Sequence, residues 1–272
     1  MISLGCAKNL VDAEVMLGSL MADGMEITNE PAEADALIVN TCSFIDSAQE
    51  ESVDTILESS ELRSVQQPGQ ALIVSGCLPQ RFREELPKLM PEVDAFMGVD
   101  QIAEVSRIVR EAMAHRATQP VEGARPMSKK KLAAPASEIN VRPKYVPDVE
   151  TPRFRLTPQH FAYVKIAEGC NHPCSFCIIP RMRGSHRSRQ QADIVAEAKE
   201  LIAQGVKELN LISQDSTYYG MDLRPGHRRT ISSPEKFARA NADLPEDAAT
   251  LCSLLRELNA IPGDFWIRLL YT

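Results

Sequence analysis

The sequence has 272 residues and a mass of 30.1 kDa, a length that predicts one or two domains. Its content of 44% hydrophobic and 25% charged residues is typical of globular proteins and excludes a wholly disordered chain. The sequence contains no apolar run of 18 residues and no basic-then-apolar leader, which excludes a membrane helix and predicts a cytoplasmic location. In that compartment the seven cysteines are expected to be metal ligands or free thiols rather than disulfides.

Charge is distributed unevenly along the chain. Residues 1–115 have 7 Lys and Arg against 20 Asp and Glu, residues 116–189 have 14 against 5, and residues 190–272 have 9 against 12. The acidic first part would repel phosphates and is a poor polyanion binder. The basic middle part could attract an anionic partner such as RNA or a ribosome. A solvated linker with a few anion-binding arginines is an equally good interpretation.

Residues 1–115 alternate short aliphatic runs with longer amphipathic stretches. The runs predict strands at residues 2–4, 36–40 and 71–75, and a weaker one at 95–99. Apolar residues at helical spacing predict helices around residues 10–18, 53–57 and 102–109. Aliphatic strands that alternate with helices indicate an α/β domain with an open parallel, Rossmann-like sheet covered on both faces.

A cysteine follows each of the first three predicted strands: Cys6, Cys42 and Cys77. Because the carboxyl ends of parallel strands share one edge of the sheet, these three thiols can converge although they are far apart in sequence. Gly5 and Gly76, next to two of them, allow close approach of the backbone. A shared metal site is the favoured interpretation. Three buried, inert cysteines are the alternative, since free cysteine is among the most buried residue types.

Residues 116–160 have a different character. They contain seven prolines, a basic run at Lys129–Lys131 and few apolar clusters. This composition predicts a partly extended connector without a core of its own.

A strand predicted at residues 161–167 leads into the strongest signal in the chain. Cys170, Cys174 and Cys177 lie on one short loop with Cys-x3-Cys-x2-Cys spacing. Three thiolates can ligate three irons of a 4Fe–4S cluster and leave the fourth iron open to a substrate. Zinc is the alternative, but it normally needs four ligands, and the spacing of His172 is unlike the usual Cys/His pairs. We therefore expect His172 not to be a ligand.

Four arginines follow the cysteine loop and suit the binding of a carboxylate or phosphate: Arg181, Arg183, Arg187 and Arg189. A plain solvated loop is nearly as good an interpretation for Arg181. His186, which lies among them, is expected to be a surface or loop histidine rather than a ligand.

The remaining elements predict further βα units. A helix at 192–204 and a strand at 206–213 precede a polar, Arg-rich insertion at 221–242. Asp243–Glu246 resembles a capping box for a helix with a core stripe at Leu251, Leu254, Leu255 and Leu258. Cys252 beside that stripe has no second cysteine near it and is expected to be structural. A third strand is predicted at 265–271.

The compact cysteine triad resembles the radical S-adenosylmethionine (SAM) superfamily, whose motif is Cys-x3-Cys-x-aromatic-Cys, with Phe176 at the aromatic position. In that superfamily SAM binds the open iron, and an electron from the cluster cleaves it to a 5′-deoxyadenosyl radical. Two triads in one chain, the first scattered and the second compact, resemble the methylthiotransferase family over nearly the whole chain.

Within that family, four stretches are similar to the RimO type, which methylthiolates an aspartate of a small-subunit ribosomal protein (protein twelve). They are Ser3-Leu-Gly-Cys-Ala-Lys-Asn-Leu-Val-Asp12, residues 45–57, Lys165-Ile-Ala-Glu-Gly-Cys170 and Gln214-Asp-Ser-Thr-Tyr-Tyr-Gly220. The MiaB-like branch, which modifies adenosine in tRNA, typically has a Gly-Gln-Asn sequence at the last of these. Gln214 and Asp215 therefore favour the ribosomal-protein branch.

The resemblance implies a methylthiotransferase domain at 1–115, a linker at 116–160 and a radical SAM core at 161–272 built as a partial TIM-type barrel. It implies an auxiliary 4Fe–4S cluster held by Cys6, Cys42 and Cys77, and a SAM-cleaving 4Fe–4S cluster held by Cys170, Cys174 and Cys177. It also places Phe176 against the adenine of SAM, and Gln214 and Asp215 near SAM or the substrate.

The implied reaction adds a methylthio group to the β-carbon of the aspartate. That C–H bond has no acidic proton, so acid–base catalysis cannot open it and a radical is required. One SAM would supply the methyl group and another the radical. The implied partners are the ribosomal protein or ribosome, an electron donor of the flavodoxin or ferredoxin type, and a sulfur source, with no membrane.

Two features depart from the family pattern. Met1 precedes Cys6 by only five residues, which shortens the first strand and is consistent with a start site placed late. The family barrel has about six βα units and a following RNA-binding-type (TRAM) domain, whereas three strands follow the linker here. We therefore expect a C-terminally truncated member whose third strand ends as an exposed edge. A tRNA adenosine methylthiotransferase and a non-catalytic iron–sulfur or zinc-binding fragment are the alternatives.

Overall fold

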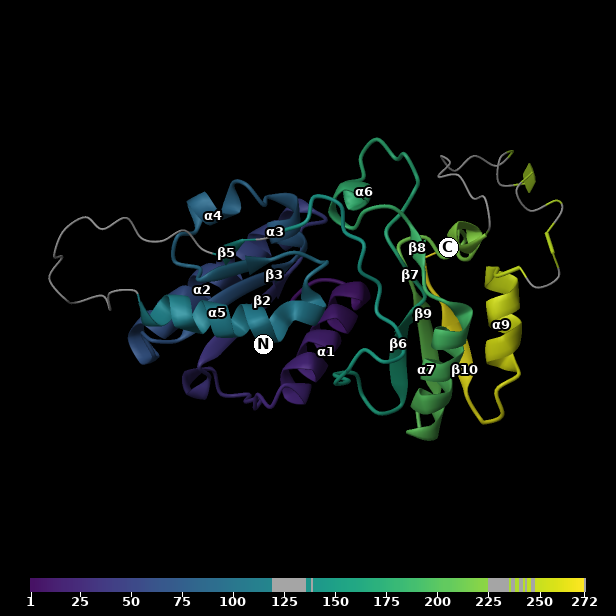
Figure 1. Ribbon diagram of the computed structural model, residues 1–272, viewed down its shortest axis with the longest axis horizontal. Coiled ribbons are helices and arrows are strands. Elements are labelled where there is room, and N and C mark those ends of the chain that lie inside the picture. Colours follow the sequence, from purple (N-terminus) through teal and green to yellow (C-terminus); the bar gives the residue numbers. More distant parts are fainter. Residues whose placement is uncertain are drawn as a thin grey trace, which may run out of the picture. The chain divides into compact units, whose positions relative to one another are not determined.

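A computed structural model describes residues 1–118, 136–137, 139–224, 235, 238–239, 242, 244–245 and 248–271 of the chain. The chain divides into two compact units, which are described separately (Figure 1). Unit 1 comprises Met1–Pro143 with Pro152–Phe154, and unit 2 comprises Lys144–Thr151 with Arg155–Thr272. In the described residues no helix is long and apolar enough to cross a membrane.

Unit 1 contains the open parallel sheet expected from the sequence. Its strands pair in the order in which they occur in the chain: β1 (Ile2–Ser3), β2 (Ala36–Thr41), β3 (Ala71–Gly76), β4 (Ala95–Met97) and β5 (Ala136–Ser137). Thr41 lies opposite Gly76, so β2 and β3 end at the same level. The sequence did not predict β5, which comes from the segment expected to be a linker and pairs with β4.

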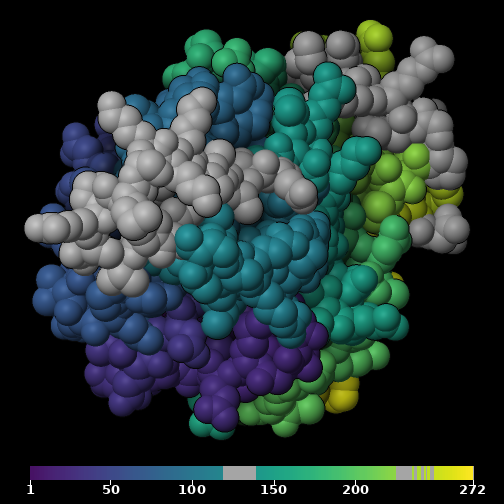
Figure 2. All heavy atoms as spheres, turned by 60° about the vertical axis from the view of Figure 1, so that its left-hand side comes forward, coloured from purple at the N-terminus to yellow at the C-terminus, as the bar shows by residue number. Residues whose placement is uncertain are grey.

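Helices cover both faces of this sheet. The helices of unit 1 are α1 (Ala7–Ala22), α2 (Asp46–Gln66), α3 (Cys77–Arg81), α4 (Leu86–Leu89) and α5 (Val105–Ala117), with short 3-10 turns at Pro31–Glu33 and Ile102–Glu104. Leu72 and Val74 pack with Ile56 of α2 in one core cluster. Ser75, which points to the other face, lies 3.6 Å from the sulfur of Met16 in α1. Figure 2 shows α1 and α5 side by side on the surface of unit 1.

Residues of the predicted linker complete unit 1. The Arg153 side chain pairs with Glu14 of α1, whose carboxylate is fully buried, and its Nε donates to Glu14 Oε2 over 2.8 Å. The backbone N–H of Phe154 donates to the carbonyl of Glu14 over 2.9 Å. Gly18 allows this approach, since a Cβ atom there would lie 2.5 Å from the backbone nitrogen of Arg153. Part of the linker is thus packed against α1.

Unit 2 is built on three parallel strands in the order β10-β9-β6, as the three predicted βα units require. These are β6 (Phe161–Lys165), β9 (Glu208–Ile212) and β10 (Trp266–Leu269), with the helices α7 (Gln191–Ala203) and α9 (Leu251–Asn259). An antiparallel ribbon of β7 (Ala167–Glu168) and β8 (Arg187–Ser188) lies between β6 and α7 in the chain, with the short helix α6 (Ile179–Met182) between its two strands. The 3-10 turn η3 spans Met221–Leu223, and most of the predicted insertion lies outside the described residues.

One aliphatic cluster holds unit 2 together. Leu209 and Leu211 of β9 are fully buried, as are Leu254 and Leu258 of α9, which confirms the centre of the predicted leucine stripe. Cys252 is exposed on the same helix. In β10 exposed and half-buried residues alternate, and it is an edge strand of the described sheet.

Helix α9 begins with a capping box. Thr250 Oγ1 accepts the N–H of Ser253 over 2.9 Å, and Ser253 Oγ accepts the N–H of Thr250 over 2.8 Å. The capping box predicted from the sequence falls on Asp243 and Glu246, which lie outside the described residues.

Replacement of this cap should have a modest, measurable effect. Thr250→Ala removes an acceptor from the first turn of α9, so the free energy of unfolding should fall by about 1 kcal/mol in urea titrations. Cys252→Ala is the matched control on the exposed side of the same helix, with an expected change within about 0.5 kcal/mol. Equal effects of the two substitutions would contradict a capping role for Thr250.

Candidate functional site

The first cysteine triad lies at the carboxyl edge of the sheet in unit 1, as expected from the pattern of strands. Cys6 is the N-cap residue of α1, Cys42 follows β2 directly, and Cys77 opens α3 directly after β3. A Cβ atom at Gly5 would lie 3.1 Å from the sulfur of Cys42, so the turn that carries Cys6 lies against Cys42. The thiol of Cys6 is exposed, whereas Cys42 and Cys77 are buried.

Buried polar side chains, which the sequence pattern did not indicate, connect the turns of this edge through hydrogen bonds. Asn9 Nδ2 donates to the carbonyls of Leu4 over 2.7 Å and Thr41 over 3.1 Å. Asn40 Nδ2 donates to the carbonyl of Asn9 over 2.8 Å. Both amides are buried under the turns that carry the cysteines.

The second triad lies on the loop between β7 and α6 in unit 2. Cys170 is buried, Cys177 is half-buried and Cys174 is exposed. The N–H of His172 donates to Cys170 Sγ over 3.4 Å, and the N–H of Cys177 donates to the carbonyl of Cys174 over 3.1 Å. Burial raises the pKa of the Cys170 thiol, and the charges of Asp215 and the two other cysteines raise it further.

Within the described residues, no three His, Cys, Asp or Glu side chains are close enough together to hold a metal ion. The donor type and the placement of the cysteines fit an iron–sulfur cluster in each case, because thiolates are the usual ligands and each triad lies at one sheet edge or on one loop. The thiols must move closer together to bind one.

A buried ionic network holds the start of the second loop. Glu168 Oε2 accepts from Lys165 Nζ over 2.8 Å and lies 3.3 Å from Arg183 Nη1. Burial raises the pKa of Glu168, but the charges of Lys165 and Arg183 outweigh burial and hold the pKa well below its usual range. Gln214 joins the network, since its amide donates to Glu168 Oε1 and accepts the N–H of Gly169 over 2.8 Å. The predicted residue Gln214 thus contacts the cysteine loop through both ends of its amide.

The second predicted residue after β9 also lies against this loop. Asp215 Oδ2 lies 2.9 Å from His172 Nε2. This distance is within ion-pair range, but the two groups are not aligned for a hydrogen bond. Its other oxygen accepts from the backbone N–H and the hydroxyl of Thr217. Phe176, in contrast, is 87% exposed. Gln214 and Asp215 therefore lie against the cysteine loop, and Phe176 extends from it into solvent.

The expectation of an anion-binding arginine loop is wrong for three of the four arginines. Arg183 pairs with Glu168, and Arg189 pairs with Glu197 and donates to the carbonyl of Lys165. Arg187 donates to the backbone carbonyls of Ser185, Arg183 and Tyr145. Carboxylates and carbonyls of the chain itself accept hydrogen bonds from these guanidinium groups, because all three arginines lie in or beside the buried β7–β8 ribbon. Arg181 is exposed, as expected for a solvated position.

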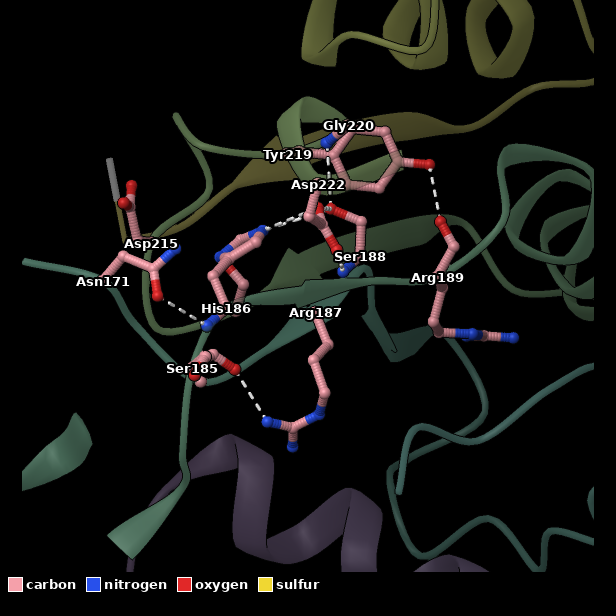
Figure 3. A network of polar contacts seen from close by, with 12 residues as sticks. Asn171, Ser185, His186, Arg187, Ser188, Arg189, Asp215, Tyr219, Gly220 and Asp222 are labelled. Carbon is pink, nitrogen blue, oxygen red and sulfur yellow. Dashed lines mark hydrogen bonds and ion pairs between the residues drawn. The ribbon is translucent and has the colours of Figure 1, made fainter. Parts of the chain in front are cut away.

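His186 lies in a loop, as expected, but it is buried rather than on the surface (Figure 3). Its Nε2 is 3.1 Å from Ser188 Oγ, which donates to Asp222 Oδ1 over 2.6 Å. Its backbone N–H donates to Asn171 Oδ1 over 3.2 Å, which connects the network to the cysteine loop. Burial lowers the pKa of His186 and outweighs the negative charges of Asp222 and Asp215, which raise it. Because Asn171 and Asp222 are 15 and 34 positions from the residues that they bind, no local motif could have identified the network.

Comparisons with known proteins match the two units of the chain separately. Residues 1–98 match the model of an uncharacterized protein family, UPF0004, and residues 164–268 match that of the radical SAM superfamily. Among solved structures, a radical SAM methyltransferase (TsrM) from Kitasatospora setae has a TM-score of 0.46 and 14% identity, and the match covers 78% of this chain and 46% of that one.

Curated relatives align with the whole chain. Three are named ribosomal protein uS12 methylthiotransferase RimO: those of Opitutus terrae (51% identical), Akkermansia muciniphila (50%) and Geobacter sulfurreducens (44%). Each alignment covers 100% of this chain but only 54%, 55% and 52% of the relative, so the chain spans about half the length of the curated relatives it matches. With its radical SAM match at residues 164–268 and its alignment along the whole chain to proteins of this name, the chain is similar to the RimO-type radical SAM methylthiotransferases.

Proposed function

We propose that this chain carries the cluster-binding parts of a radical SAM methylthiotransferase that modifies ribosomal protein uS12. The reaction would add a methylthio group to the β-carbon of an aspartate in that protein. The observation that carries the proposal is the placement of two cysteine triads, each at or beside the carboxyl edge of a parallel sheet. Ligands of open α/β sheets bind at that edge. The names of the relatives supply the substrate.

The proposed ligands of the auxiliary cluster are Cys6, Cys42 and Cys77, and those of the SAM-cleaving cluster are Cys170, Cys174 and Cys177. When bound with SAM, such a cluster supplies the one-electron chemistry that can open a C–H bond without an acidic proton. Gln214 and the buried Glu168 fix the backbone at Gly169, which sets the direction of the loop that carries Cys170. The exposed side chain of Phe176 is proposed to contact the adenine of SAM.

Asp215 is proposed to lie near SAM or the substrate, where its pairing with His172 ties the second strand end to the cysteine loop. The proposed domains are 1–115 and 161–272, joined by the segment 116–160, of which residues 136–137 and 152–154 pack within unit 1. The proposed partners are uS12 or the ribosome, a flavodoxin- or ferredoxin-type electron donor and a sulfur source. A ribosomal substrate would place the enzyme in the cytoplasm.

An iron and acid-labile sulfide count tests the cluster assignment. Protein reconstituted without oxygen should hold about eight irons, and Cys6→Ala/Cys42→Ala/Cys77→Ala should hold about four, because two clusters of four irons are expected. The variant with Ala at Cys170, Cys174 and Cys177 should also hold about four. Four irons in both the wild type and the first variant would overturn the auxiliary cluster. Zinc without sulfide would overturn the radical assignment altogether.

The substrate is tested in cells that lack the gene. The mass of uS12 should fall by one methylthio increment, about 46 Da, on one aspartate. An unchanged uS12 together with loss of a methylthio-adenosine from tRNA would overturn the ribosomal substrate in favour of tRNA.

A further inference from the structure

We propose that Asn9, Asn40 and Thr41 form a polar brace that positions the three thiol-bearing turns of unit 1 for the auxiliary cluster. The inference rests on the proposed function, because it assumes that Cys6, Cys42 and Cys77 hold that cluster. It assigns a role to side chains that lie beside the cysteines in space and are not proposed as ligands themselves.

Asn9 connects the turn that carries Cys6 with the strand end that carries Cys42. Its amide nitrogen donates to the carbonyl of Leu4, two residues before Cys6, and to the carbonyl of Thr41, directly before Cys42. The side chain is 1% exposed, so these hydrogen bonds form away from water. A single amide thereby sets the distance between two thiol-bearing segments that are 36 positions apart.

Asn40 extends the connection to the third segment. Its amide nitrogen donates to the carbonyl of Asn9 over 2.8 Å and to Ser3 Oγ over 3.4 Å. Its Oδ1 is buried, has no hydrogen-bond partner among the described residues, and lies against the turn before Cys77, where a Cβ atom at Gly76 would be 2.7 Å from it. Asn40 therefore contacts segments on both sides of its own strand.

Thr41 completes the link to Cys77. Its hydroxyl donates to the carbonyl of Ser75 over 2.6 Å and accepts the N–H of Leu78 over 3.3 Å. Ser75 and Leu78 enclose Gly76 and Cys77 in sequence, so the hydroxyl holds the turn on both sides of the thiol.

The position of these polar residues argues against a role limited to holding the core. Strand β2 is aliphatic at Leu37, Ile38 and Val39, and becomes polar only at Asn40 and Thr41, both fully buried, just before Cys42. Buried amides and hydroxyls contribute little net stability over an apolar residue, but they fix geometry when they are hydrogen-bonded. The switch from aliphatic to polar residues occurs where the backbone must hold thiols in a set arrangement.

A brace of this kind acts on a cluster as outer hydrogen-bonding partners act on other metal sites. Removal of such partners typically weakens metal affinity by ten- to a hundredfold, because the ligands must be ordered when the metal binds. The same loss is expected here, although none of the three side chains is proposed to touch the cluster.

The test uses the full chain with Ala at Cys170, Cys174 and Cys177, so that only the first triad can bind metal. Asn9→Leu, Asn40→Leu and Thr41→Val remove the brace with little change in volume. Gln70→Met is the matched control, because Gln70 is equally buried at the opposite end of the sheet, where its amide donates to the carbonyls of Pro31 and Ala34. Anaerobic Co²⁺ titration, iron and sulfide content, the EPR signal of the reduced cluster and the melting temperature are measured for each.

The brace variants should bind Co²⁺ at least about tenfold more weakly and retain half or less of the iron. Gln70→Met should melt at a similarly lowered temperature and bind metal as its parent does. Normal binding by the folded brace variants, or an equal loss in Gln70→Met, would overturn the brace alone. No metal uptake by the parent would overturn the proposed auxiliary cluster, and the brace with it. Should the two amide variants fail to fold, Thr41→Val, which keeps shape and burial, decides the question by the same criteria.

Discussion

Gly169→Ala should both destabilise unit 2 and disturb the loop of the second cysteine triad. Gly169 has φ +80°, and a Cβ atom there would lie 2.1 Å from the carbonyl oxygen of Ser185. Alanine is strained in the left-handed conformation and also collides with backbone that cannot move like a flexible side chain. The free energy of unfolding should fall by about 2–5 kcal/mol in urea titrations.

A second glycine separates the cost of the left-handed conformation from the cost of the collision. Gly205, after α7, has φ +93° but nothing within 4 Å of its Cβ position. Gly205→Ala should therefore lower the free energy of unfolding only by the cost of an alanine in the left-handed conformation, about 1–2 kcal/mol. Iron content at the second triad should fall in Gly169→Ala and stay unchanged in Gly205→Ala. Equal losses in the two variants would mean that the backbone at Ser185 yields, and that Gly169 is not needed for the close approach.

Glu168→Gln should be the most damaging single change in the charge network of unit 2. It leaves Lys165 and Arg183 buried without the carboxylate that they share. Removal of one partner from a buried ion pair typically costs about 3–5 kcal/mol, since the remaining charge is not solvated. Urea titration measures the loss. Glu208→Gln is the control, because Glu208 pairs with the exposed Arg268 at 3.0 Å, where water screens the charges, and its effect on the free energy of unfolding should be much smaller.

The cost of Glu168→Gln should depend on pH in a defined direction. Because the pKa of Glu168 is held below its ordinary value, the ionised carboxylate stabilises the folded state. That contribution is complete above the unfolded-state pKa of about 4.3 and is lost as the pH falls further. The difference between wild type and Glu168→Gln should therefore be constant near neutrality and shrink below about pH 4. A difference that grows on acidification would contradict the assignment.

The sequence predicted the strands and the cysteine positions because both depend on local pattern. Runs such as Ala36–Val39 and Ala71–Val74 are aliphatic without interruption, and a parallel sheet covered on both faces requires that pattern. A thiol one residue past a strand end must then lie at the carboxyl edge. The resemblance to the family, and not the local pattern, singled out Gln214 and Asp215, which follow the strand predicted at 206–213.

Side-chain pairing could not be predicted, because it depends on which segments meet in space. The arginines after Cys177 suggested an anion site, yet Arg183 and Arg189 neutralise carboxylates from the same unit. The sequence around His186 did not indicate that it is buried, because its burial depends on contacts with Ser188 of β8 and Asp222 of η3, which meet only in the folded chain. Residues 152–154 were assigned to a linker from composition alone, which does not reveal that Arg153 reaches Glu14.

The pairing of Glu14 with Arg153 has a consequence for the order in which the protein is made. The two residues are 139 positions apart, and the last segment of unit 1 is Pro152–Phe154. On a ribosome, every strand and helix of unit 1 emerges before the arginine that neutralises the buried carboxylate of α1. The final packing of α1 must therefore wait until residue 154 has left the exit tunnel, when the start of unit 2 is already being synthesised. A nascent chain arrested when residue 143 has left the tunnel and residue 153 has not should be cleaved in α1 by protease, and one arrested after residue 154 has also left it should resist.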